Sequence, residues 1–171
     1  MIGMVSGTER SAGFPPIARS DARVLILGSL PGVRSIAEGE YYAHPRNAFW
    51  PIMSDLAGAT GEYPERCAAL LDKGIAVWDV LASSVRPGSL DANIDLQTAQ
   101  VNNFEKFFAA HANVARVCFN GQAAAKIFAA RVPPNAMPRI LEKQTLPSTS
   151  PAHAAMNFAE KLTRWRDGLG L

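Results

Sequence analysis

The residues of this chain that could do chemistry are mostly neutral amides and aromatics. Asn47 lies in the run YYAHPRNAFW (41–50), and Asn120 ends the apolar segment ARVCFN. An amide side chain orients water and reads a hydrogen-bonding edge, but it does not titrate. Asparagines among aromatic rings therefore predict a pocket for a flat, uncharged ring, and a reaction whose leaving group departs with modest help.

Three short segments are candidates to border such a pocket, and none of them contains Asp or Glu: GSLPG (28–32), FNG (119–121) and LPSTSPA (146–152). GSLPG is not the GxSxG turn that carries a catalytic serine. It also lacks the GxGxxG and GxxxxGK[ST] patterns, so dinucleotide and nucleoside triphosphate sites are poorly supported. Cys67 and Cys118 are far apart, so we expect neither a disulfide nor a cysteine-ligated metal.

The overall composition is that of an ordinary soluble domain. The 171 residues are 48% hydrophobic and 19% charged, and the net charge of +2 permits nucleic-acid binding without arguing for it. No apolar run reaches transmembrane length and no signal peptide is recognisable, so we expect a cytoplasmic protein that does not enter a membrane. We also expect a flexible N-terminus over residues 1–13 and a single domain over residues 14–171.

Apolar runs and helical spacing predict alternating strands and helices. The predicted strands cover residues 23–29, 75–81, 115–120 and 139–145, and the predicted helices cover residues 47–58, 64–73, 102–111, 122–130 and 153–165. Residues 83–100 are expected to form a long polar loop, either functional or a floppy insertion. Such alternation predicts a three-layer α/β/α sandwich around a mainly parallel four-stranded sheet. Its ligand edge lies beyond the carboxyl ends of the strands, where GSLPG, FNG and LPSTSPA would meet.

In this order, GSLPG, YYAHPRNAFW, FNG and LPSTSPA resemble the motifs of the uracil-DNA glycosylase superfamily. The likeness runs from Phe14 to about His153 and is closest to the hypoxanthine-DNA (deoxyinosine) glycosylase branch, the sixth family. The resemblance implies a monomeric DNA repair enzyme without metal or cofactor, acting on double-stranded or single-stranded DNA at the nucleoid. Such an enzyme hydrolyses the N-glycosidic bond of a flipped deaminated base, first of all hypoxanthine, and leaves an abasic site.

The resemblance also implies a catalytic residue. Several branches of the superfamily carry the residue that directs water within the GxxPG loop, where this chain has Ser29 and Leu30. The deoxyinosine branch resembles this chain and uses the Asn of the PRNxFW run, which is Asn47 here. The residue alone is equally consistent with a helix cap, and the two roles can coexist. No lysine occupies the motif segments, so the implied enzyme is monofunctional.

Further roles follow from the matched positions. Tyr42 stands where the superfamily places an aromatic that stacks on the flipped base, with Phe49 as the second choice. Asn120 matches a residue that reads the base edge, and Gly28 and Ser29 border the base. The implied phosphate and wedge segments comprise Pro31, Gly32, Ser148, Thr149, Ser150, Pro151, Ala152 and His153. His153 departs from the Asn expected at that position.

Other functions remain open at this point. The same chemistry on uracil or mismatched uracil is one alternative, because pocket width is not readable from a sequence. A non-catalytic DNA- or nucleotide-binding module is another, since the usual carboxylate is absent from GSLPG. Arg86 is interpreted either as a phosphate contact or as a solvated loop residue. Asp79 is interpreted as a partner of loop amides with no catalytic role.

Overall fold

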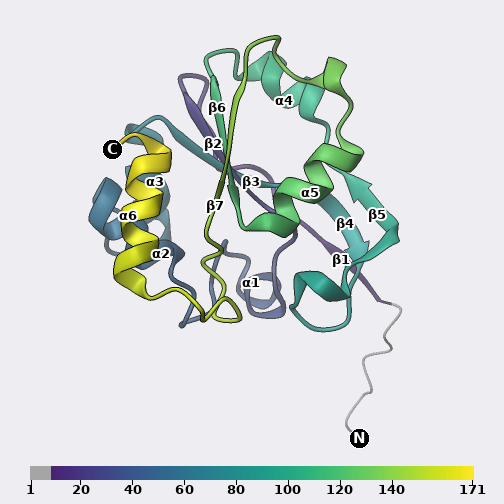
Figure 1. Ribbon diagram of the computed structural model, residues 1–171, viewed down its shortest axis with the longest axis horizontal. Helices are drawn as coiled ribbons and strands as arrows, with labels where there is room; N and C mark the ends of the chain where they lie inside the picture. Colours follow the sequence, from purple (N-terminus) through teal and green to yellow (C-terminus); the bar gives the residue numbers. More distant parts are fainter. Residues whose placement is uncertain (1–8) are drawn as a thin grey trace, which may run out of the picture.

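The computed structural model describes residues 9–171 (Figure 1). Its centre is a parallel four-stranded sheet in the order β3-β2-β6-β7, with bounds β2 (Val24–Gly28), β3 (Ile75–Asp79), β6 (Arg116–Asn120) and β7 (Glu142–Leu146). Strands β2 and β3 are almost continuous apolar runs, because both faces of the sheet are covered. The register pairs Gly28 with Asp79, so these two residues end their strands at the same edge.

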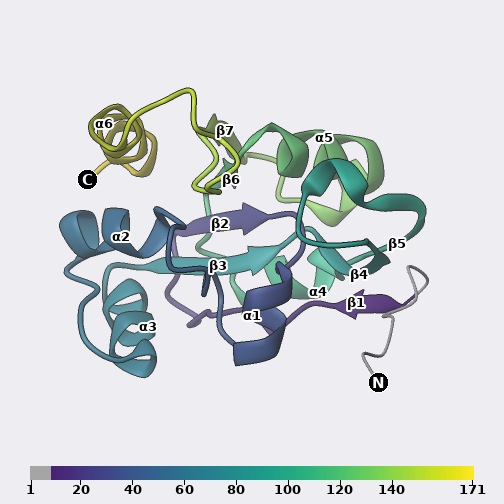
Figure 2. The same cartoon turned by 90° about the horizontal axis from the view of Figure 1, so that it is seen from below.

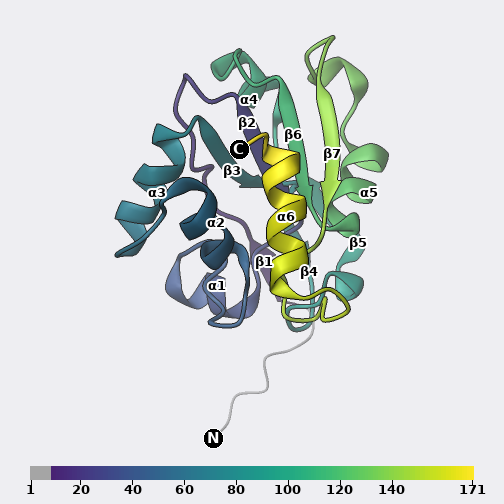
Figure 3. The same cartoon turned by 60° about the vertical axis from the view of Figure 1, so that its left-hand side comes forward.

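Helices cover both faces of this sheet, which confirms the predicted α/β/α layers. One layer contains α2 (Phe49–Ala57), α3 (Tyr63–Asp72) and α6 (Phe158–Leu169), and the other contains α4 (Phe104–Ala110) and α5 (Gln122–Arg131) (Figure 2). Figure 3 shows α6 alongside α2, in front of the sheet. The short α1 (Val33–Glu38) and the loop between β7 and α6 lie at the same end of the sheet (Figures 1 and 3).

The segment predicted as a long loop forms a second sheet instead. Strands β1 (Arg10–Ala12), β4 (Leu81–Val85) and β5 (Asp95–Val101) pair antiparallel in the order β1-β4-β5. Only Val80 separates β3 from β4, so the chain passes directly from one sheet into the other. The prediction was wrong because these strands are polar, and their hydroxyls bond across the sheet: Ser83 Oγ donates to Gln100 Oε1 at 3.1 Å.

Other boundaries differ from the predictions for local reasons. Residues 10–12 were expected to be flexible but pair with β4, while residues 1–8 lie outside the described part of the chain. The last helix begins at Phe158 rather than His153, because Asn157 and Glu160 form a reciprocal capping box at that point. Two 3-10 helices, η1 (Asp91–Asn93) and η2 (Pro134–Ala136), lie in connecting segments.

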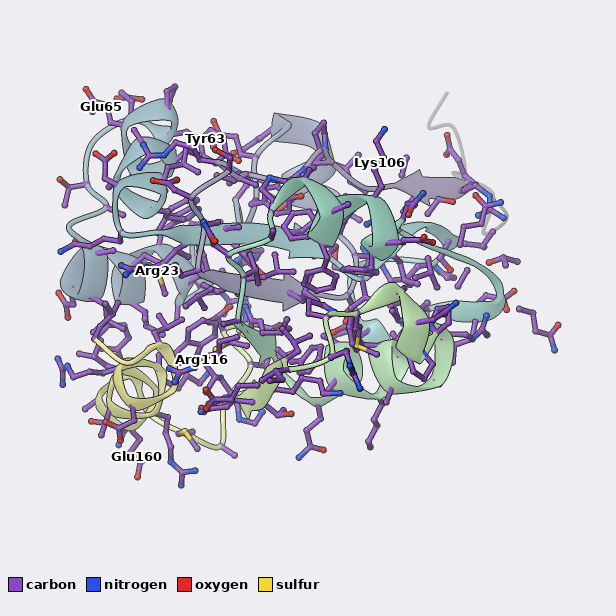
Figure 4. All side chains as sticks on the ribbon, turned by 90° about the horizontal axis from the view of Figure 1, so that it is seen from above. Arg23, Tyr63, Glu65, Lys106, Arg116 and Glu160 are labelled. Carbon is purple, nitrogen blue, oxygen red and sulfur yellow. The ribbon has the colours of Figure 1, made fainter. Side chains whose placement is uncertain are left out.

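The core lies on both faces of the parallel sheet. Trp165 and Phe49 are 0% exposed and meet edge to face between α6 and α2, while Phe119 packs against Phe128 on the α5 side. Charged residues of the helices, among them Glu65, Lys106 and Glu160, extend outward from the layers (Figure 4). No helix within residues 9–171 is long and apolar enough to cross a membrane.

Candidate active site

A cleft of about 670 Å³ lies at the carboxyl end of the parallel sheet. Four loop segments form most of its lining: residues 28–32, residues 41–47, residues 89–92 and residues 148–153. Asp79 and Asn120, which end β3 and β6, line the same cleft. The shared edge predicted from the strand ends is therefore confirmed. Every predicted site residue lines the cleft except Phe49.

Asn47 lies in the cleft immediately before α2. Its Oδ1 accepts a hydrogen bond from the Phe49 N–H at 2.9 Å, which satisfies one of the unpaired amides at the helix start. The N-cap position itself belongs to Ala48, so the predicted cap is displaced by one residue. Within residues 9–171 the Asn47 Nδ2 group donates to no acceptor. The helix contact therefore leaves the amide nitrogen free to hold a water or a ligand.

Tyr42 has an unusual backbone and a supported ring. Its φ of 56° makes it the single non-glycine residue with positive φ within residues 9–171, a conformation that residues adopt mainly where the surrounding structure imposes it. The ring stacks on Phe49 with centroids 4.1 Å apart and an interplanar angle of 25°. Phe49 was the second choice for stacking on a base, but it is 0% exposed. It supports Tyr42 from the core because the first turn of α2 faces inward.

Asn120 uses its side chain to hold the loop that follows β7. Its Oδ1 accepts from the Thr149 N–H at 2.9 Å, and its Nδ2 donates to Thr149 Oγ1 at 2.9 Å. Thr149 is 1% exposed, and its carbonyl accepts from the Ala48 N–H at 2.9 Å. One buried threonine therefore connects the end of β6 to the start of α2. Asn120 has a structural role beside the predicted one of reading a base edge.

Residues 148–153 form a compact loop whose ends are fixed. Trp165 Nε1 donates to the Pro147 carbonyl at 2.9 Å, and Lys161 Nζ donates to the His153 carbonyl at 2.8 Å. Lys161 itself is only 5% exposed. The His153 side chain itself is exposed beside the cleft. The fixed backbone of residues 148–153 suits the predicted contact with phosphates.

Arg86 holds the GSLPG loop from beneath. It is neither a phosphate contact nor solvated, since only 1% of its side chain is exposed. Its guanidinium donates to the carbonyls of Leu30 and Pro31 and lies 3.8 Å from an Asp91 carboxyl oxygen. Ser29 Oγ donates to the same carboxyl group at 3.3 Å. The segment between β4 and β5 is therefore fixed to the loop after β2.

Asp79 is buried in the cleft without the loop amides that were expected to bind it. It is 4% exposed, and its Oδ2 has no hydrogen-bond partner within residues 9–171. Burial, helped by the Asp91 charge and opposed by Arg86, raises the pKa of this carboxyl to about 7. Tyr42 Oη is likewise buried and unpartnered in the described chain. The cleft thus contains two polar groups whose hydrogen bonds are not made.

Asp79 and Arg86 are the residues whose importance the sequence did not reveal. Asp79 belongs to a strand that reads as apolar core, and Arg86 to a segment that reads as a loop. Their positions in the sequence are the signal that could have found them. Asp79 ends its strand beside Gly28. Arg86 is followed by Pro, Gly and Ser, which are residue types that form turns. Within residues 9–171 no three His, Cys, Asp or Glu side chains converge as a metal site would require.

A family model, curated relatives and a solved structure all relate this chain to one superfamily. The family model for the uracil DNA glycosylase superfamily matches residues 15–168. A hypoxanthine DNA glycosylase of Methanosarcina barkeri is 35% identical over 116 residues, covering 66% of this chain and 72% of that protein. A Methanosarcina acetivorans protein of the same name is 32% identical over 115 residues, with the same coverage.

The fold has a solved counterpart. A solution NMR structure of a candidate uracil DNA glycosylase from Methanosarcina acetivorans superposes with a TM-score of 0.75 at 28% identity. The likeness covers 95% of this chain and all of that chain. Together with the cleft and its motif residues, these matches show that the chain belongs to the uracil DNA glycosylase superfamily.

Proposed function

We propose that this DNA glycosylase removes hypoxanthine from deoxyinosine in DNA, with Asn47 directing the attacking water. The observation that carries the proposal is the pairing of two features in one cleft. Tyr42 offers a supported aromatic face, and Asn47 offers an amide nitrogen that the fold leaves free. The printed names of the two Methanosarcina relatives support hypoxanthine as the base.

The reaction begins with extrusion of the nucleotide. A base stacked in a duplex is out of reach, and flipping it costs a few kcal/mol, less when it pairs poorly, as a deaminated base does. The flipped purine would stack on Tyr42, an interaction worth roughly 1–3 kcal/mol. Backbone amides of residues 28–32 and 148–153 would hold the flanking phosphates, together with Arg46 at the exposed rim of the cleft.

Hydrolysis then needs a placed water and a stabilised leaving group. As the bond from C1′ to N9 lengthens, positive charge develops on the sugar and negative charge on the base. The DNA phosphates stabilise the sugar cation, and hydrogen-bond donors around the base stabilise the anion. Asn47 holds the water against the sugar without accepting its proton, because an amide does not titrate. We propose that the protein acts as a monomer on double-stranded DNA at the nucleoid.

The direct test uses end-labelled duplexes that carry a single deoxyinosine or deoxyuridine, followed by alkaline cleavage of abasic sites. We expect strand breaks at deoxyinosine, and a loss of about 100-fold or more in the single-turnover rate for Asn47→Ala. Asn135→Ala is the matched control, because Asn135 lies exposed in η2 outside the cleft. Breaks mainly at deoxyuridine would contradict the proposed base. No breaks on either duplex would favour a binding module.

A further inference from the structure

Asp79 is the one carboxyl group deep in the cleft, and the fold does not satisfy it. A methyl group placed on Gly28 would lie 2.6 Å from Asp79 Oδ1 and 3.0 Å from Tyr42 Oη, so a glycine at this position leaves room for both groups. Neither Asp79 Oδ2 nor Tyr42 Oη has a partner among the described residues. A buried polar group without a hydrogen bond is destabilising, and native proteins retain few of them.

Three polar side chains next to Asp79 at this edge of the sheet are already bonded. Asn120 is engaged with Thr149 through both amide atoms, and Ser29 Oγ donates to Asp91. Arg86 is directed toward the carbonyls of the GSLPG loop. Besides the Asn47 Nδ2 group that the proposed function assigns to the water, Asp79 Oδ2 and Tyr42 Oη are cleft groups with no hydrogen-bond partner within residues 9–171.

The chemistry of the base matches a neutral carboxyl group. Hypoxanthine presents a donor, N1–H, next to an acceptor, O6. A protonated carboxyl presents an acceptor oxygen next to an O–H donor, so the two can form a cyclic pair of hydrogen bonds. An ionised carboxylate presents only acceptors, and it would repel O6 and the negative charge of the departing base.

We infer that Asp79, as a neutral carboxyl group, pairs with the N1–H and O6 edge of the flipped hypoxanthine and stabilises the departing base. This inference rests on the proposed function. The step is an ordinary hydrolysis: the water oxygen bonds to C1′ and the electron pair of the C1′–N9 bond leaves with the base. One O–H bond of the water breaks, and its proton passes through solvent to the purine anion. Asp79 transfers no proton. The hydrogen bond from its O–H group to O6 of the base strengthens as negative charge spreads into the purine.

The surroundings of Asp79 keep its carboxyl group mainly neutral at pH values below about 7. Burial, together with the charge of Asp91 from the segment between β4 and β5, raises its pKa to about 7. Arg86 from the same segment opposes this shift, but its hydrogen bonds go to loop carbonyls. The groups facing Asp79 from residues 41–42 are the tyrosines Tyr41 and Tyr42, whose own pKa values are raised by burial and by the Asp79 charge. Both tyrosines are therefore neutral neighbours.

Two substitutions separate a neutral pairing role from an ionised one. Asp79→Asn keeps an acceptor next to a donor but cannot titrate, whereas Asp79→Leu keeps a similar volume and removes both. We expect the single-turnover rate on a deoxyinosine duplex to fall for wild type as pH rises above about 7, and to stay level for Asp79→Asn. At about pH 6.5 we expect Asp79→Asn within about 10-fold of wild type, and Asp79→Leu slower by about 100-fold.

The controls keep the outcomes distinct. Asp55→Asn makes the same change at an exposed position of α2 and should alter neither the rate nor its pH profile. Circular dichroism and thermal unfolding should show each variant folded. An inactive Asp79→Asn, or a wild-type rate that rises with pH, would overturn the inference in favour of a carboxylate. Unchanged activity in Asp79→Leu would also overturn it. Wild type without activity on deoxyinosine would instead contradict the proposed function itself.

Discussion

Asn47 and Asn120 line the same cleft, but their side chains are engaged differently. Asn120 is 7% exposed, and both of its amide atoms bond to Thr149. Asn47 is half-buried and uses only Oδ1, toward the Phe49 amide. The same amide group therefore has two different roles. A side chain whose hydrogen bonds are made within the chain holds the structure together, and a side chain with an unused donor can bind a ligand. Asp79 and Tyr42 Oη belong with Asn47 by this criterion.

The largest expected effect is the pH dependence of the free energy of unfolding that the unpartnered Asp79 causes. The pKa of Asp79 rises on folding from 3.8 to about 7, so the native state binds the proton more tightly than the unfolded chain. Its contribution to the free energy of unfolding therefore falls as pH rises from about 4 to about 7, by up to about 4 kcal/mol. Urea unfolding of wild type and Asp79→Asn across this range should show the variant gaining relative stability with pH. A constant difference would contradict the assignment.

The next effect separates rate from stability at Asn47. Asn47→Ala should slow base release by about 100-fold or more, because water is no longer positioned. It should change the free energy of unfolding by no more than about 1 kcal/mol, since only one half-buried hydrogen bond at the helix start is lost. Single-turnover kinetics and urea unfolding measure the two quantities. A variant that lost stability in proportion to its activity would place Asn47 beside Asn120 as a structural residue.

Asn120→Ala should show the reverse pattern. Removing the amide leaves the buried Thr149 N–H and hydroxyl without partners, and we expect a loss of about 2 kcal/mol in unfolding free energy. Thr149→Val removes only the hydroxyl half of the contact and should cost less. Hydrogen exchange of the Thr149 amide would report the loosened loop directly. Full stability in Asn120→Ala would show that the Thr149 contact is not what holds residues 148–153.

The smallest expected effect is on binding at Tyr42. Tyr42→Leu removes the aromatic face and should weaken binding of a deoxyinosine duplex by about 10-fold, near the lower range of base stacking energies. Tyr42→Phe keeps the ring and its packing on Phe49, and it should bind within about 3-fold of wild type. Equilibrium binding with a catalytically slow Asn47→Ala background measures both. Equal losses in the two variants would assign the contact to Oη rather than to the ring.

Sequence patterns were sufficient for the parts of the fold that depend on local burial. The central strands are apolar runs that end in glycine or asparagine, so their order along the chain and their shared ligand edge could be predicted. The antiparallel sheet could not, because its strands are polar and their hydroxyls pair only after folding. β1 was missed for a related reason: a three-residue strand has no periodicity to detect.

Sequence alone determined the fold class, the family and the residue types that gather at the cleft, because apolar periodicity and motif spacing are local properties of a chain. Only the tertiary structure decided which of these residues are already bonded. Asn120 is hydrogen-bonded to a threonine 29 positions away, and Arg86 is hydrogen-bonded to a loop 55 positions away. Asp79 Oδ2 has no partner within residues 9–171. Hydrogen-bond partners of this kind come from distant segments, and a pKa depends on burial that no local pattern contains.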